Sequence, residues 1–320
     1  MTHKAEPLTK FLLPIDGKGT FNASCRLAAS LASACGDRVK QITLLHVMAG
    51  RYLSTHMANI DIRVDTVLES DTFRRLRKNF IDREIRPVLD EARGIIETLY
   101  SGASIDSDVK DGKPAQVIIK FVTEKDYSTI IMQRRCMDPV KGSFIGSVTS
   151  GILYGSSSSS VYIPGTDFPQ EGKAEFKNLL VPVDGSAGSL AAVKEAAVLM
   201  SCAQDAQIIL LNVVDVIDIA KAAEENLWPT PVQEAEGILK KAEGVLMKSG
   251  ITPERIVKKA VPGDPSEVIV AEADSCEADI VYIGRTIRSA LTDVIVGSVG
   301  RAVLGRCAKK TLAVVTPATE

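Results

Sequence analysis

Residues 178–189 read NLLVPVDGSAGS, an apolar run that ends in an aspartate followed by glycines and serines. The run over residues 178–183 is short and apolar enough to be a buried β-strand. Asp184 then follows directly on that strand, and Ser186 or Ser189 can cap a helix after it. A carboxylate in this place has two explanations: it shapes a turn and caps the helix, or it contacts a ligand.

The same form occurs near the start of the chain, where residues 11–20 read FLLPIDGKGT. Asp16 lies 168 residues before Asp184. Two later glycine pairs lie 151 residues apart, namely Gly112 with Gly263 and Gly146 with Gly297. The first copy therefore has 17 extra residues between its aspartate and Gly112. Repetition on this scale indicates two tandem units.

The length of the chain agrees with two units, because 320 residues suit about two domains of 100–200 residues each. The polar stretch GTDFPQEGKAEF, residues 165–176, has the composition of a linker. We therefore predict a first domain over residues 1–166 and a second domain over residues 174–320.

Within each copy the hydrophobic period alternates between strand and helix. In the second copy we expect strands over 178–183, 207–214, 255–261, 279–283 and 311–315, with helices after Ser186 and over 231–249, 265–273 and 297–305. In the first copy we expect strands over 11–16, 41–47, 103–111, 128–133 and 161–164. The predicted fold is α/β, with two tandem doubly wound domains. Each has a five-stranded, mostly parallel sheet flanked by helices.

The extra residues of the first copy fall in its second helical region. Residues 71–100 are too long for one ordinary helix, and we expect Pro87 to divide them into two helical pieces. Their dense charges indicate a solvated face, with a surface for a protein partner as the alternative.

Composition narrows the class of protein. Hydrophobic residues make up 45% and charged residues 24% of the chain, and no apolar run reaches the roughly 18 residues that span a membrane. A net charge of −2 gives no general attraction to nucleic acid or to anionic lipid. The first residues have no signal-peptide core, which favours a cytoplasmic location. The six scattered cysteines are expected to be reduced packing thiols, without disulfide or zinc.

Motifs of dedicated catalysis are missing from the sequence. It contains neither a G-x-x-x-x-G-K-[ST] loop nor a G-x-S-x-G elbow. Its three histidines, His3, His46 and His56, lack the paired spacing of metal ligands. We therefore expect no catalytic residues and no metal, and hence a binding protein rather than an enzyme.

The aspartates can be placed on the predicted sheet. Ligands of open parallel sheets bind outside the carboxyl ends of the strands, where the strand order reverses. If strands one and four of a copy flank that point, the loop after Asp184 meets residues 284–300, GRTIRSALTDVIVGSVG. This loop ends in a glycine–serine helix start, whose free N–H groups favour an anion. A plain helix cap explains the same residues, and the loop arginines 134, 135, 285 and 288 either meet phosphates or face water.

With these residues the chain resembles the universal stress protein family, in particular its tandem two-domain members, from about Lys10 to Pro317. Nucleotide-binding members have Gly, two residues, Gly, nine residues, then Gly and Ser or Thr after strand four. The second copy matches with Gly284, Gly297 and Ser298, but Ile287 stands at the middle glycine. The first copy has Gln133 and Cys136 at the first two glycine positions and keeps residues 146–149, Gly-Ser-Val-Thr.

The resemblance implies a site for ATP or a related adenine nucleotide, mainly in the second domain. The residues implied there are Pro182, Val183, Asp184, Val213, Gly284, Gly297, Ser298, Val299 and Gly300. A weaker first-domain site is implied at Pro14, Ile15, Asp16, Val47, Gly146, Ser147, Val148 and Thr149.

The implied function is that of a cytoplasmic regulatory or protective binding protein. The alternative keeps the fold and drops the nucleotide, leaving a structural or interaction protein that binds another small ligand or a protein partner. We also expect the two copies to pair through their fifth strands, over 161–164 and 311–316, as single-domain members of the family do on dimerisation. A homodimer of the whole chain is left open.

Overall fold

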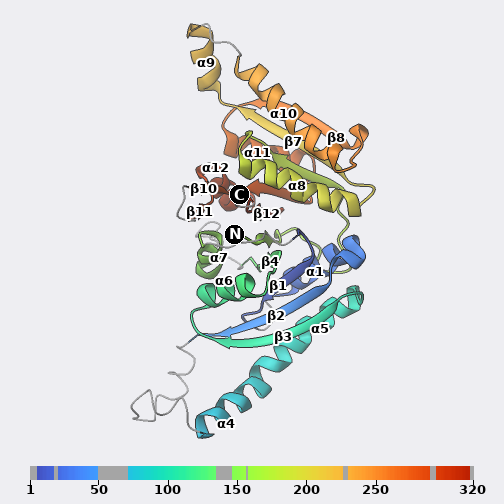
Figure 1. Ribbon diagram of the computed structural model, residues 1–320, viewed down its shortest axis with the longest axis vertical. Helices are drawn as coiled ribbons and strands as arrows, with labels where there is room; N and C mark the ends of the chain where they lie inside the picture. The colour runs from blue at the N-terminus through green and yellow to red at the C-terminus, as the bar shows by residue number, and fades with distance from the viewer. Residues whose placement is uncertain are drawn as a thin grey trace.

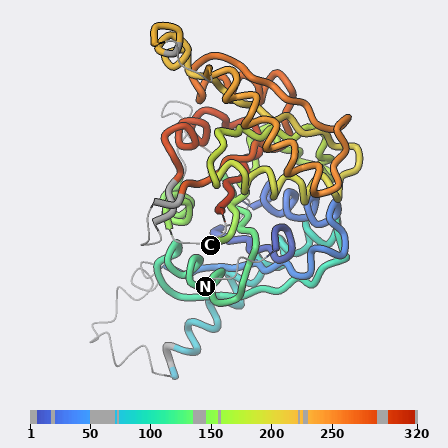
Figure 2. Tube along the Cα trace, turned by 45° about the horizontal axis from the view of Figure 1, so that its top comes forward, coloured from blue at the N-terminus to red at the C-terminus, as the bar shows by residue number. Residues whose placement is uncertain are grey.

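In the computed structural model the two halves of the chain are stacked one above the other along the long axis of the molecule (Figures 1 and 2). The structure describes residues 6–17, 21–49, 71–134, 146–155, 158–225, 230–288 and 293–317. The predicted residues His3, His56, Arg135 and Cys136 lie outside these ranges.

The first half alternates strands and helices in the predicted order. Its elements are β1 (Lys10–Pro14), α1 (Asn22–Cys35), β2 (Gln41–Met48), α4 (Asp71–Phe80), α5 (Arg86–Leu99), β3 (Ser104–Asp111), α6 (Pro114–Glu124), β4 (Thr129–Ile131), α7 (Ser147–Leu153) and β5 (Ser160–Ile163).

The second half repeats this order and adds two features. Its elements are β6 (Asn178–Pro182), α8 (Ala187–Cys202), β7 (Gln207–Val214), α9 (Val216–Glu225), α10 (Pro231–Lys248), β8 (Ile256–Pro262), α11 (Pro265–Ser275), β9 (Ile280–Gly284), β10 (Thr286–Arg288), β11 (Asp293–Ile295), α12 (Ser298–Arg306) and β12 (Thr311–Val315). All ten predicted strands are present, which confirms the fold class. Helix α9 and the β10–β11 hairpin were not predicted.

The strands form one continuous ten-stranded sheet rather than two separate sheets. Its order is β3-β2-β1-β4-β5-β12-β9-β6-β7-β8, so each half has the doubly wound order with its first and fourth strands adjacent. Pairing is parallel within each half, and β5 joins β12 in antiparallel fashion, with Tyr162 opposite Ala313. The predicted pairing of the two fifth strands is confirmed.

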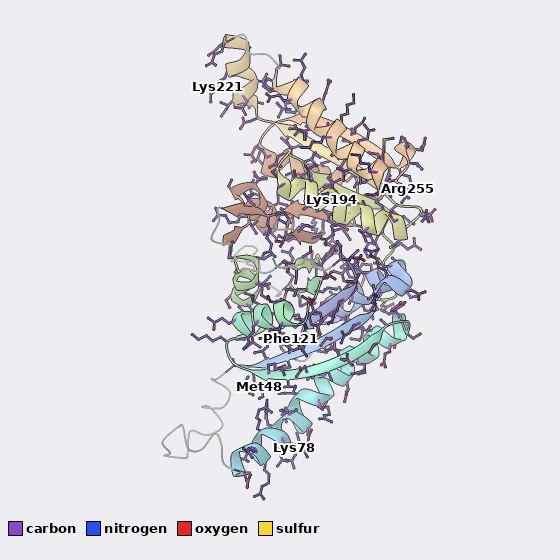
Figure 3. The ribbon with its side chains drawn as sticks, viewed as in Figure 1. Met48, Lys78, Phe121, Lys194, Lys221 and Arg255 are labelled. Atoms are coloured by element: carbon purple, nitrogen blue, oxygen red, sulfur yellow. The ribbon has the colours of Figure 1, made fainter. Side chains whose placement is uncertain are left out.

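Helices cover both faces of this sheet. Buried side chains of α1, α5, α8 and α10 form a core on one face, and those of α6, α7, α11 and α12 form the core on the other. Helices α4 and α9 project at opposite ends of the molecule, where Figure 3 labels Lys78 and Lys221. None of the described helices is long and apolar enough to cross a membrane.

The region around Pro87 differs from the expected break. The chain stays helical between α4 and α5, because residues Ile81–Ile85 form a π-helical segment. The N–H of Arg86 donates to the carbonyl oxygen of Ile81, five residues earlier. Pro87 has no N–H and cannot donate the hydrogen bond of an α-helix. The wider π-helical turn just before it lets the helix continue past this residue. Two α-helical pieces therefore exist, but they are joined without a break.

The stretch between the domains is packed against the first domain. The N–H of Ala174 donates to Ser30 Oγ at 2.9 Å, and Arg26 Nη1 donates to the carbonyl oxygen of Gly172 at 3.2 Å. Phe168 and Phe176 are buried. This stretch thus contributes to the body of the protein.

Candidate functional site

A cavity of about 300 Å³ lies at the carboxyl edge of the second half-sheet, at the point where the strand order reverses between β6 and β9. All nine residues predicted for the second-domain site line it. Sequence reasoning did not find eight further lining residues: Ser186, Ser189, Leu211, Asn212, Pro265, Ile269, Ile283 and Thr286.

Asp184 is held in position by the start of α8. The N–H of Ser186 donates to Asp184 Oδ1 at 2.9 Å, and the N–H of Ser189 donates to Ser186 Oγ at 3.1 Å. Burial by itself would raise the pKa of the Asp184 carboxyl, but hydrogen bonds from Ser186 and Ser189 outweigh it and lower this pKa below its ordinary value. Asp184 is therefore an ionised acceptor of hydrogen bonds at the cavity. Ser186 also caps the start of α8, as the helix-cap explanation predicts.

Asn212 fixes the backbone beside that aspartate. Its side chain is buried on β7, and its Nδ2 donates to the carbonyl oxygen of Val183 at 2.7 Å. The N–H of Val183 donates to Leu211 at 2.8 Å, so both backbone groups of Val183 are satisfied. The residue before Asp184 thus has little freedom to move.

Gly284 is required by close packing of two backbones. A Cβ at Gly284 would lie 2.2 Å from the carbonyl carbon of Gly188, and a Cβ at Gly188 would lie 2.2 Å from the carbonyl oxygen of Arg285. These distances are far inside van der Waals contact, so the start of α8 and the end of β9 meet only because both residues are glycine. The two walls of the cavity are brought together at this point.

The N-terminus of α12 supplies the opposite wall. Gly297 precedes the helix and gives it no side-chain cap, and the first N–H bonded within the helix is that of Arg301, to Gly297. The residues of this first turn, Ser298, Val299 and Gly300, line the cavity. Uncapped N–H groups at a helix start attract anions.

Comparison with known proteins follows the same boundaries as the repeat. The sequence profile of the Universal stress protein family matches residues 7–163 and 175–315. The chain belongs to the universal stress protein family. A universal stress protein of Methanocaldococcus jannaschii is 28% identical over 155 residues, which are 47% of this chain and 89% of that relative.

Solved structures agree in fold over both domains. A universal stress protein of Archaeoglobus fulgidus has a TM-score of 0.66 at 21% identity, covering 97% of this chain and 98% of that one. A Pseudomonas aeruginosa protein described as belonging to the same family has a TM-score of 0.60 at 14% identity, covering 97% and 94%. The tandem arrangement is therefore shared along the whole chain.

Arg285 does not face the cavity of this universal stress protein. Its side chain is fully buried between the two domains, with Nη1 and Nη2 both 3.4 Å from carbonyl oxygens of Leu153 and Ser159. Burial lowers the pKa of the guanidinium to about 10, and the nearby Glu195 carboxylate opposes that shift. The phosphate-contact alternative for Arg285 is thus wrong. Arg134, its counterpart in the first copy, lies near Cys307 of the second domain.

The first-domain residues occupy equivalent places. Pro14 ends β1, Ile15 and Asp16 follow it, Val47 lies on β2, and residues 146–149 lie at the start of α7. His46 Nδ1 is 2.8 Å from the carbonyl oxygen of Ile15, the bond that Asn212 makes in the second domain. Burial lowers the pKa of His46, so the neutral ring with its proton on Nδ1 is the donor.

The first domain also fills a glycine position with a polar side chain. Gln133 stands where the second domain has Gly284, and its Oε1 accepts a hydrogen bond from the N–H of Ser24 at 3.0 Å. This N–H belongs to the first turn of α1. The glutamine thus satisfies the helix N–H group whose counterpart in the second domain, that of Ser189, donates to Ser186 Oγ.

Proposed function

We propose that this universal stress protein is a regulatory or protective binding protein that holds an adenine nucleotide of the ATP type in the cavity of its second domain. The single observation behind the proposal is the pairing of one ionised carboxylate, Asp184, with the uncapped N-terminus of α12 across the same cavity. The carboxylate suits ribose hydroxyls, and the helix start suits phosphates. A volume of about 300 Å³ lies at the lower end of the range for small-molecule sites.

The apolar residues of the cavity support a flat heterocycle. Val213 lines it from β7 and Ile269 from α11, beside Pro182 at the end of β6 and Val183 directly after it. Such walls suit a base, because most of the surface of a bound small molecule contacts apolar groups while a few polar groups orient it.

The proposal assigns binding, not turnover, to the cavity. Among the described residues that line it, Asp184 alone carries a titratable side chain. The other polar lining residues are hydroxyls and the amide of Asn212. A phosphoryl transfer site needs cationic or metal groups that stabilise the developing charge, and those are not among the lining residues.

The first domain is proposed to bind nucleotide weakly or not at all. Gln133 supports this, because it places a side chain at a position where the second domain has Gly284. The acceptor Asp16 is retained, so the difference lies in the loop and not in the carboxylate.

The test is calorimetry of ATP binding to the full chain and to two matched variants. Asp184→Ala removes an acceptor of hydrogen bonds, each worth about 1.5–3 kcal/mol, and should weaken binding about ten- to a hundredfold. Asp16→Ala is the equivalent change in the other copy and should leave affinity nearly unchanged. If the parent protein binds no adenine nucleotide at millimolar concentration, the interaction-protein alternative replaces this proposal. Stronger weakening by Asp16→Ala would move the site to the first domain.

A further inference from the structure

Two cysteines from different domains meet at the ends of equivalent helices. Cys35 is the last residue of α1, and Cys202 is the last residue of α8. These helices pack against each other across the domain boundary. Cys35 belongs to the buried cluster against which Cys202 packs, and a hydrogen bond between the two thiols shifts the pKa of each. The sequence separates the two cysteines by more than half of the chain, so the fold alone creates the pair.

The two thiols differ in access and in protonation. Cys35 is buried, whereas Cys202 is partly exposed. The hydrogen bond from Cys35 lowers the pKa of Cys202, and Arg38 acts in the same direction against the effect of burial. The same hydrogen bond and burial raise the pKa of Cys35. Cys202 is therefore the more accessible thiol and the one whose ionisation the pair favours, and Cys35 is the thiol that keeps its proton, the division between an attacking and a resolving cysteine.

The remaining described cysteines have different surroundings. Arg26 and Glu91 act on the charge of Cys25. Cys276 lies near Glu272 and Lys259, and Cys307 near Asp274 and Arg134. The neighbours that act on these three thiols are charged side chains and not other cysteines. The pair at the domain boundary is thus chemically distinct from them.

We propose that Cys35 and Cys202 form a peroxide-reactive dithiol that closes into a disulfide between the two domains. Its substrate class is a hydroperoxide, with hydrogen peroxide as the simplest member.

The reaction has two balanced steps. The Cys202 thiolate attacks one peroxide oxygen and the O–O bond breaks, which leaves a sulfenic acid on Cys202 and a hydroxide that takes up a proton to become water. Cys35 Sγ then attacks the sulfur of Cys202 and the S–O bond breaks. The leaving oxygen takes the Cys35 proton and departs as a second water. The two sulfur atoms lose two electrons in total, and the peroxide gains them.

The dithiol lies apart from the cavity, at the other end of α8. The sulfur atoms must approach to about 2.05 Å. Gly36 follows Cys35 at φ 54°, in the left-handed region. The end of α8 is held by Arg255, whose guanidinium donates to carbonyl oxygens of Met200 and Ala203 at 2.9 and 2.6 Å (Figure 3). Because the cavity adjoins the opposite end of α8, at Ser186 and Ser189, the dithiol does not depend on nucleotide binding.

The experiment treats the fully reduced, native full-length protein with hydrogen peroxide, blocks remaining thiols by alkylation, and maps digested peptides by mass spectrometry without reduction. The expected product is a peptide pair that joins Cys35 to Cys202, formed within one chain and released by dithiothreitol. In non-reducing electrophoresis the oxidised chain should migrate faster, because the bond closes a loop of more than half its length.

Variants separate the two roles. In Cys35→Ser the sulfenic acid on Cys202 should persist and be captured by dimedone, whereas Cys202→Ser should abolish both the bond and the capture. Cys25→Ser, a buried cysteine of the same helix α1, is the matched control and should behave as the parent protein does. The proposal fails if the parent protein shows no Cys35–Cys202 peptide, if other cysteines link equally well, or if the bond forms only between chains. The parent result needs no variant, so a misfolded variant does not remove the test.

Discussion

The amide of Asn212 donates a hydrogen bond of 2.7 Å to the carbonyl oxygen of Val183, one residue before Asp184. His46 makes the equivalent bond of 2.8 Å to Ile15, one residue before Asp16. The two domains therefore use different side chains to fix the same backbone group. The shared requirement is an N–H donor at this register of the second strand, because the buried carbonyl would otherwise lack a partner.

Replacement of Asn212 should test that requirement. Asn212→Leu removes the donor at similar volume, leaves the Val183 carbonyl unpaired, and should lower the free energy of unfolding by about 1–3 kcal/mol. Asn212→His restores the donor found in the first domain and should recover part of the loss. Urea unfolding measures both, with Gln207→Ala, an exposed change on the same strand, as the control. Equal stability of the leucine and histidine variants would contradict a role for the donor.

The order of strands within each half followed from the sequence, because it depends on strong, local patterns. Ten strand segments, two aspartates and the repeat spacing are sufficient to predict two doubly wound halves. Helix α9 was missed because its exposed Val216 and Ile217 give no clear apolar stripe toward a core. The joining of the halves into one sheet required a pairing of edges that only the family resemblance suggested.

The lining of the cavity was predicted in part, for a physical reason. Residues marked by a strand end or by the glycine spacing were found, and all nine of the second domain line one cavity. Asn212 was missed because a single buried amide in an apolar strand has no periodic signal, although its register match with His46 could have indicated it. Arg285 is buried because it contacts Leu153 and Ser159 of the first domain. Aligning the two copies with each other does not reveal such a contact between them.

Gly284 offers a steric test of the cavity walls. Gly284→Ala should lower the free energy of unfolding by at least about 1–3 kcal/mol, because the new Cβ would meet the backbone of Gly188 at 2.2 Å and one wall must move. The matched control is Gly237→Ala in α10, where nothing lies within 4 Å of the new Cβ. That change should stabilise the helix by up to about 1 kcal/mol. Thermal unfolding of the two variants compares them directly, and a neutral Gly284→Ala would refute the close approach.

Arg285 and Glu195, both of the second domain, should be coupled at the buried boundary between the domains. Glu195 accepts hydrogen bonds from Ser160 Oγ at 2.5 Å and Tyr162 Oη at 3.0 Å, and its charge favours the buried guanidinium. Arg285→Met and Glu195→Gln should each destabilise the protein, and the double variant should lose less than the sum. A double-mutant cycle by urea unfolding should give a coupling of about 0.5–3 kcal/mol. Strict additivity of the two changes would show that the charges act independently.

The lowered pKa of Asp184 predicts how the free energy of unfolding changes in acid. Because hydrogen bonds from Ser186 and Ser189 lower the pKa of this carboxyl in the folded protein, its ionised form contributes stability above the ordinary value of 3.8. That contribution is lost as the pH falls through the lower, folded pKa. Asp184→Asn keeps the side-chain shape and cannot titrate. The difference in free energy of unfolding between the parent protein and Asp184→Asn should therefore stay constant from pH 7 to about pH 5 and shift against the parent below about pH 4. Urea unfolding of both proteins at several pH values measures it. A shift that favours the parent protein on acidification would mean that burial, and not hydrogen bonding, dominates at Asp184.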